Sequence, residues 1–87
     1  MRDKSRVVNL INCAFPEFKP DLSMTIKYGE NVLAYKCKEK RAKIIIDVKN
    51  ITLIWVNKKG EEKTASIDYG NVWEMDLLVF IESRLML

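Results

Sequence analysis

The sequence predicts a single α+β domain, in which one helix precedes and another follows a five-stranded antiparallel β-meander (α-β-β-β-β-β-α). Apolar residues recur at helical spacing at both ends of the chain, while the middle alternates apolar and polar residues between short turns. The successive turns also align apolar residues on one face of the sheet. The 87 residues suffice for one hydrophobic core, so we expect one domain over residues 1–87.

A helix is expected over residues 3–15. Its apolar side chains form one broad stripe at helical spacing, consisting of Val7, Val8, Leu10, Ile11, Ala14 and Phe15. Asp3 or Ser5 can cap the first turn, and Pro16 ends the helix because proline lacks a backbone N–H. We expect the stripe to pack on the sheet, although the pattern does not indicate which sheet face it covers.

The first strand is expected over residues 21–28, where apolar and polar residues alternate. Gly29-Glu30 suits a two-residue hairpin turn with glycine in its first position. This turn places the strand beside the next one, with Met24 opposite Tyr35.

Three further turns continue the meander and keep the apolar residues on one face. A four-residue loop at residues 38–41 places Tyr35 opposite Ile44. A two-residue turn at Lys49-Asn50 places Ile46 opposite Leu53. A three-residue loop, closed between Asn57 and Glu61 and with Gly60 in a left-handed conformation, places Leu53 opposite Ala65.

The last helix is expected over residues 72–86, with Asn71 as its cap and Glu74 completing a capping box. Its main stripe consists of Trp73, Leu77, Phe80 and Ile81. We expect this helix, together with the amino-terminal helix, to cover the apolar sheet face. A second stripe, Val72, Met75, Val79 and Met86, indicates either an adaptable binding surface or a helix that is buried on two sides. The patterns leave open whether the sheet curls into a partial barrel.

The residue types argue against catalysis. Histidine, the commonest general base, is absent, the three glycines are isolated turn residues, and Cys13 and Cys37 have no metal-binding or redox spacing. We therefore expect no catalytic residue, no metal and no cofactor. The amino terminus shows no signal-peptide pattern, and no apolar run approaches the ~18 residues of a membrane span, so we expect a cytoplasmic protein without membrane contact.

One candidate binding surface lies on the sheet face opposite the predicted core. The register places Ala34, Ile45, Ile54 and Val56 there, with Lys36 and Lys43 at the rim. An apolar centre with a charged rim is typical of protein interfaces, so the patch predicts a protein partner or self-association as a homodimer. The alternative is that a helix or a curl of the sheet covers these residues.

A second candidate surface is basic. It consists of Lys36, Lys38, Lys40, Arg41 and Lys43, joined by Lys58 and Lys59 of the loop between Asn57 and Glu61. Such loops can contact nucleic-acid phosphates, and the net charge of +3 is compatible with an acidic partner. No aromatic residue interleaves with these charges to stack on bases, and the alternative is a solvated loop whose lysines oppose aggregation.

These patterns together predict a small non-enzymatic protein that acts by binding another macromolecule. A protein is the main expectation for the partner, and nucleic acid is the alternative. By analogy with other compact domains that lack motifs, we expect an inhibitor, an immunity protein or a regulator, of the kind that phages and other mobile elements also encode.

Overall fold

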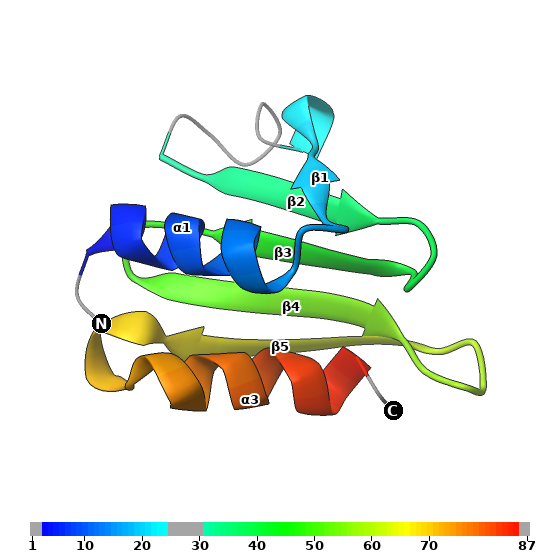
Figure 1. Ribbon diagram of the computed structural model, residues 1–87. Helices are drawn as coiled ribbons and strands as arrows, with labels where there is room; N and C mark the ends of the chain where they lie inside the picture. The colour runs from blue at the N-terminus through cyan, green and yellow to red at the C-terminus, as the bar shows by residue number, and fades with distance from the viewer. Residues whose placement is uncertain (1–2, 25–30, 86–87) are drawn as a thin grey trace.

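The computed structural model describes residues 3–24 and 31–85, and its helices and strands form two layers (Figure 1). The strands form one antiparallel sheet in the order β1-β2-β3-β4-β5, so each strand lies beside the next strand in the chain. The predicted α+β meander between two helices is confirmed, and the sheet does not close into a barrel. The elements are α1 (Lys4–Ala14), β1 (Lys19–Pro20), β2 (Leu33–Cys37), β3 (Ala42–Ile46), β4 (Asn50–Val56), β5 (Glu62–Asp68), the 3-10 helix η1 (Tyr69–Asn71) and α3 (Glu74–Leu85).

The core lies on one face of the sheet, and both helices cover that face. Val7 and Ile11 of α1 and Leu77 and Ile81 of α3 are fully buried in one apolar cluster. A fully buried side chain of this kind stabilises the fold by about 1.5–3 kcal/mol relative to an exposed one. The strands contribute the inward side chains Tyr35, Cys37, Ala42, Ile44, Ile46, Ile51, Leu53 and Trp55. The sequence pattern did not indicate which face of the sheet α1 covers, and the structure shows that it covers the core face.

Two predicted strand pairings are confirmed. Tyr35 of β2 lies opposite Ile44 of β3, and Leu53 of β4 lies opposite Ala65 of β5. In the loop between β4 and β5, the N–H of Asn57 donates to the C=O of Glu61 at 2.9 Å. Gly60 adopts φ +82°, a left-handed conformation that costs glycine little.

The pairing of β3 with β4 differs from the prediction by two residues. Ile46 lies opposite Ile51 because the turn lies one residue earlier in the chain, at Val48-Lys49. Asp47 holds this turn, since its Oδ1 accepts hydrogen bonds from the backbone N–H groups of Lys49 (2.8 Å) and Asn50 (2.6 Å). An even shift keeps every side chain on its face of the sheet, so the core was predicted correctly despite the error.

The first strand lies earlier in the chain than predicted. Strand β1 places Pro20 opposite Tyr35, and residues 22–24 are helical. Asp21 begins this helical segment because its Oδ1 accepts from the Ser23 hydroxyl (2.7 Å) and the Met24 N–H (3.4 Å). The predicted strand is therefore wrong at residues 21–24. Its residues 25–28 and the predicted turn at residues 29–30 lie outside the described residues.

The helix η1 ties the end of the sheet to the turn between β3 and β4. Asp68 caps η1, with its Oδ1 accepting from the N–H of Gly70 at 2.9 Å. Tyr69 is buried, and its hydroxyl donates to the C=O of Asp47 at 2.7 Å. The N–H of Tyr69 donates to the C=O of Lys49 at 3.2 Å, so one residue holds both sides of the turn.

Helix α3 begins two residues later than predicted, because η1 uses the residue that was expected to cap it. Asn71 belongs to η1 and does not cap α3. The C=O of Trp73 instead accepts the hydrogen bond from the N–H of Leu77 at 3.1 Å. Trp73 therefore stands before the helix, outside the buried stripe to which the sequence assigned it.

Candidate functional site

The sheet face opposite the core carries the predicted apolar row, but half of that row is covered. Ala34 is 2% exposed and Ile45 is 8% exposed, whereas Ile54 and Val56 of β4 are half-buried. The expectation that Ala34 and Ile45 are accessible to a partner is therefore wrong, because alternation identifies the face of a residue and not what covers that face. Binding through Ile54 and Val56 stays a prediction.

The two lysines predicted at the rim lie directly opposite one another. Lys36 of β2 pairs with Lys43 of β3, and both are exposed. Like charges in opposed positions destabilise a strand pair. Asp21 reduces this repulsion, since its Oδ2 lies 3.8 Å from the Nζ of Lys36. The pKa of Asp21 is lowered, first by the Ser23 hydroxyl, then by the Met24 N–H and Lys36, against an opposing effect of burial.

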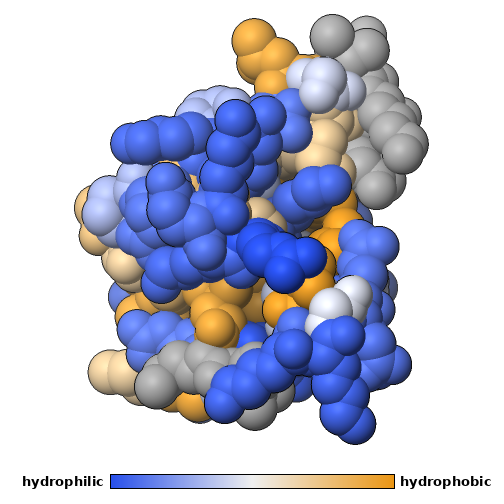
Figure 2. Space-filling model, turned by 90° about the vertical axis from the view of Figure 1, so that its right-hand side faces the viewer, coloured by the Kyte–Doolittle hydropathy of each residue, from blue (hydrophilic) through white to orange (hydrophobic). Residues whose placement is uncertain are grey.

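The other predicted cations gather at one end of the molecule. The β2–β3 loop and the β4–β5 loop lie at the same end of the sheet, which we call the hairpin end (Figure 1). Hydrophilic residues cover most of this end in Figure 2. All the predicted loop cations are exposed there: Lys38, Lys40, Arg41, Lys58 and Lys59.

Two features weaken the hairpin end as a nucleic-acid interface. The Nζ of Lys40 lies 3.4 Å from Oε1 of Glu17, and Lys36 is paired with Asp21, so part of the positive charge is balanced within the chain. The aromatic side chains of the adjoining strands, Tyr35 and Trp55, are buried in the core. They offer no ring on which bases could stack.

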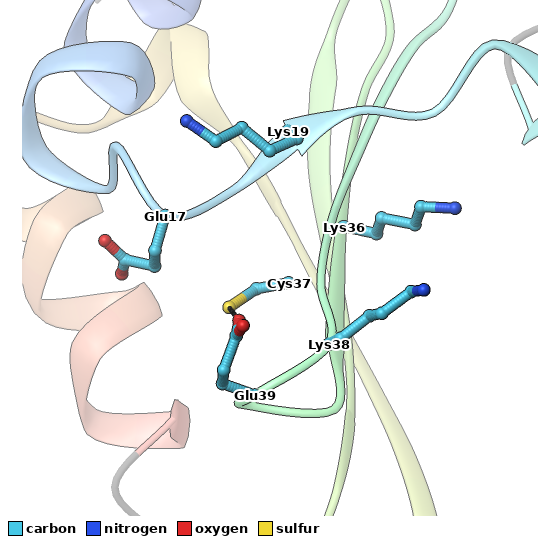
Figure 3. A pocket seen from close by; sticks show the side chains of 6 residues that line it. All are labelled: Glu17, Lys19, Lys36, Cys37, Lys38 and Glu39. Atoms are coloured by element: carbon cyan, nitrogen blue, oxygen red, sulfur yellow. Dashed lines mark hydrogen bonds between the residues drawn. The ribbon is translucent and has the colours of Figure 1, made fainter.

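A pocket of about 240 Å³ lies beside β2 at the hairpin end and is lined by Glu17, Lys19, Lys36, Cys37, Lys38 and Glu39. In Figure 3 Lys36 and Lys38 point to one side of β2, whereas Glu17, Cys37 and Glu39 point to the other. The buried Cys37 thiol donates to Oε2 of Glu39 at 3.3 Å. The backbone N–H of Glu39 and, to a smaller extent, the Cys37 thiol lower the pKa of the Glu39 carboxyl group. Because the charged groups diverge, they do not converge on one ligand.

The opposite end of the sheet is rich in carboxylates. This end, which we call the turn end, contains the Val48-Lys49 turn, η1 and the start of α3. Burial raises the pKa of Tyr69, and the negative charges of Asp47, Asp68 and Asp3 raise it further because they disfavour a phenolate. Each of these carboxylates also accepts a local backbone N–H, so the acidic character of the turn end comes from its caps and turns.

The most exposed part of the apolar surface lies at the start of α3. Trp73 is 80% exposed, Met75 69% and Val79 55%, and we call these three residues the α3 surface. Met75 and Val79 are four residues apart and are therefore neighbours on one helix face. Of the predicted second stripe, Met75 and Val79 are exposed, whereas Val72 is half-buried against the core, and Met86 lies outside the described residues.

Trp73 is a surface residue that was predicted to lie in the buried stripe of α3. The run Asp68-Tyr69-Gly70-Asn71 carries the signal that could have found it, since Asp, Gly and Asn in close succession favour a capped turn over a helix start. A capped turn there delays α3 and leaves the tryptophan outside its buried stripe.

Neither a metal-ion site nor a match to a known protein points to a further site in the described residues. Within residues 3–24 and 31–85, no three cysteine or carboxylate side chains are grouped to hold a metal ion. None of the helices in these residues has the length and apolar character needed to cross a membrane. In comparisons with protein-family models, curated proteins and solved structures, the chain has no match.

Proposed function

We propose that the protein is a non-enzymatic binding domain that recognises another protein through the α3 surface. The observation that carries the proposal is Trp73, which is 80% exposed although it is the largest kind of apolar side chain. Tryptophan and methionine are enriched at protein interfaces, and tryptophans that become buried there contribute a large share of the binding free energy.

The share of exposed apolar residues that lies at or just before α3 supports this proposal. Single exposed apolar side chains are ordinary on protein surfaces. Among the described residues, however, five large apolar side chains are mostly exposed, and three of these belong to the α3 surface. The inner side of α3 is already filled by Leu77 and Ile81, so the outer side is available to a partner.

An inhibitor or regulator fits such a surface, because these proteins act by occupying part of a partner and need no reactive group. An immunity protein acts in the same way. We place the protein in the cytoplasm as part of this proposal, and the free thiols of Cys13 and Cys37 are compatible with a reducing compartment.

Nucleic-acid binding by the hairpin end is the second candidate function. It is favoured by the gathering of exposed cations from two separate loops. Its affinity would fall steeply with salt, because phosphate contacts release counterions. The partly balanced charge and the buried aromatic side chains make it the weaker candidate.

The test is capture of partners from a nuclease-treated lysate at high salt by the tagged chain and by two variants. Trp73→Ala should lose the retained protein. Leu22→Ala is the matched control, because Leu22 is similarly exposed but follows β1, at the sheet edge opposite β5. A protein retained equally by Trp73→Ala would contradict the proposal. Nucleic acid that is retained only without nuclease, and lost on Lys40→Glu with Arg41→Glu, would favour the second candidate.

A further inference from the structure

The outward side of α3 is acidic as well as apolar. Met75 and Val79 occupy its centre, and at 3.6 residues per turn Asp76 falls on one side of them and Glu82 on the other. Glu74 adds a third carboxylate at the start of the helix. All three carboxylate side chains are exposed. Met75 and Val79 therefore form an apolar centre between negative charges.

Within the described residues, none of these carboxylates forms an ion pair. The only basic residue of α3 is Arg84, and its Nη1 donates to the C=O of Phe80 at 3.0 Å. Its guanidinium carbon lies 4.1 Å from the centroid of the Phe80 ring, so the charge is turned back onto the helix itself. The ion pairs within residues 3–24 and 31–85 use Asp21 and Glu17 instead.

The helix itself explains only part of this charge. Glu74 and Asp76 lie in the first turn, where negative charge interacts favourably with the helix dipole. Glu82 lies in the second half, where the dipole disfavours a carboxylate. Lys40 lines a pocket together with Glu82, but it is paired with Glu17. Glu82 therefore has no structural role that we can assign, and its charge is available to a partner.

We propose that the segment that docks on the α3 surface is a cationic amphipathic helix of another protein. Its apolar stripe would cover Met75 and Val79, and lysine or arginine on both sides of that stripe would face Asp76 and Glu82. This inference rests on the proposed function and specifies the chemistry of the partner. A second copy of this chain fits poorly, because two α3 surfaces bring like charges together. A nucleic acid is repelled for the same reason.

The experiment titrates the isotope-labelled full chain with two designed helical peptides and follows its amide signals by nuclear magnetic resonance. One peptide contains leucine and lysine, and the other contains leucine at the same positions and glutamate in place of lysine. The lysine peptide should shift the signals of Met75 and Val79 and bind at least about tenfold more tightly than the glutamate peptide, since charge complementarity chiefly sets specificity.

Charge reversal on the protein provides the control. Asp76→Lys with Glu82→Lys should reverse the preference between the two peptides. Glu61→Lys with Glu62→Lys makes the same change of charge at the hairpin end, where both residues are exposed, and should leave the preference unchanged. If both double variants change the preference equally, net charge and not the α3 surface governs binding, and the inference is wrong.

The remaining outcomes separate this inference from the proposed function. Equal binding of both peptides at α3 would overturn the cationic partner but leave protein binding through α3 intact. Lysine-peptide binding elsewhere, or no binding at all, would also overturn it, while lysate capture with Trp73→Ala tests the proposed function independently. Concentration-dependent self-association that is abolished by Val79→Glu would identify a second copy as the occupant.

Discussion

At both the turn end and the hairpin end, an Asp or Asn side chain closes a turn by accepting backbone N–H groups. The two ends differ in whether a buried residue of another element also bonds to that turn. At the turn end Asp47 accepts two backbone N–H groups through Oδ1, and at the hairpin end Asn57 does the same for Lys59 and Glu61, both at 2.9 Å. Among the described residues, a buried side chain of another element, Tyr69, is bonded to the Asp47 turn, and none is bonded to the Asn57 turn. Local chemistry therefore shapes both turns, while tertiary contact holds only one.

This difference matches the surfaces at the two ends. The loops of the hairpin end are exposed and bear several cations, one of which, Lys40, pairs with Glu17. The turn end is locked to the core, and it positions Trp73 at the start of α3. A rigid base beneath an exposed side chain is favourable for binding, because less conformational freedom is lost on docking.

The largest effect is expected from removing the lock at the turn end. Tyr69→Ala should lower the free energy of unfolding by about 3–5 kcal/mol, because it leaves a cavity and removes the hydrogen bond to Asp47. Trp73→Ala, a few residues away, should change it by no more than about 0.5 kcal/mol. Urea unfolding followed by circular dichroism measures both values. Similar losses for the two variants would show that Trp73 belongs to the core.

The second prediction compares the two turn residues directly. Asp47→Ala should cost about 1–2 kcal/mol, and Asn57→Ala should cost less, about 0.5–1 kcal/mol. The reason is that the Asp47 turn also positions the carbonyl groups that Tyr69 binds. The same unfolding experiment measures both values, and equal losses of free energy would show that the contacts of Tyr69 add no stability to the Asp47 turn.

The third prediction concerns backbone conformation at the hairpin end. Gly60 has φ +82°, and its Cβ would meet no neighbour, so Gly60→Ala should cost about 1 kcal/mol through backbone strain alone. Arg41 has φ +52°, and Arg41→Gly should stabilise the protein by a few tenths of a kcal/mol, roughly. Thermal unfolding of the two variants tests this, and destabilisation by Arg41→Gly would reveal a contact of the arginine side chain.

The smallest effect is expected from pH. The pKa of Tyr69 is raised above its ordinary value of 10.0, so the folded state holds this proton more tightly than the unfolded chain. Its contribution to stability is complete below about pH 10 and is lost as pH rises through the folded pKa. Tyr69→Phe should flatten the alkaline decline, and Tyr35, whose pKa burial also raises, should maintain a part of it. Unchanged alkaline stability in Tyr69→Phe would contradict the assignment.

The hairpin end was predictable from sequence, and the turn end was less so. Gly60 and the loop lengths define the registers at the hairpin end, because few turns fit those residues. At the turn end two adjacent turns keep the same apolar face, and only the hydrogen bonds of Asp47 select one of them. The position of Trp73 depends in turn on η1, whose anchor Tyr69 is distant in sequence from Asp47.

The candidate surfaces show a similar limit. Alternation placed Ala34 and Ile45 on the outer sheet face but could not show that they are buried, since burial depends on neighbouring segments. The exposed cations were predicted individually, and the topology then placed two loops at one end. The local cap at Asp21 makes residues 22–24 helical where a strand was predicted, so it outweighed the alternation of apolar residues there.

The contrast between the two tryptophans gives the protein a built-in pair of optical reporters. Trp55 is buried in the core on β4, and Trp73 is exposed before α3. Indole fluorescence shifts to shorter wavelength when water is excluded from the ring, so the two residues report different events. In Trp73→Phe the remaining emission follows unfolding of the core, and in Trp55→Phe it would follow the docking of the proposed partner at Trp73. The fluorescence of the two single-tryptophan variants thus reports unfolding and docking in separate measurements.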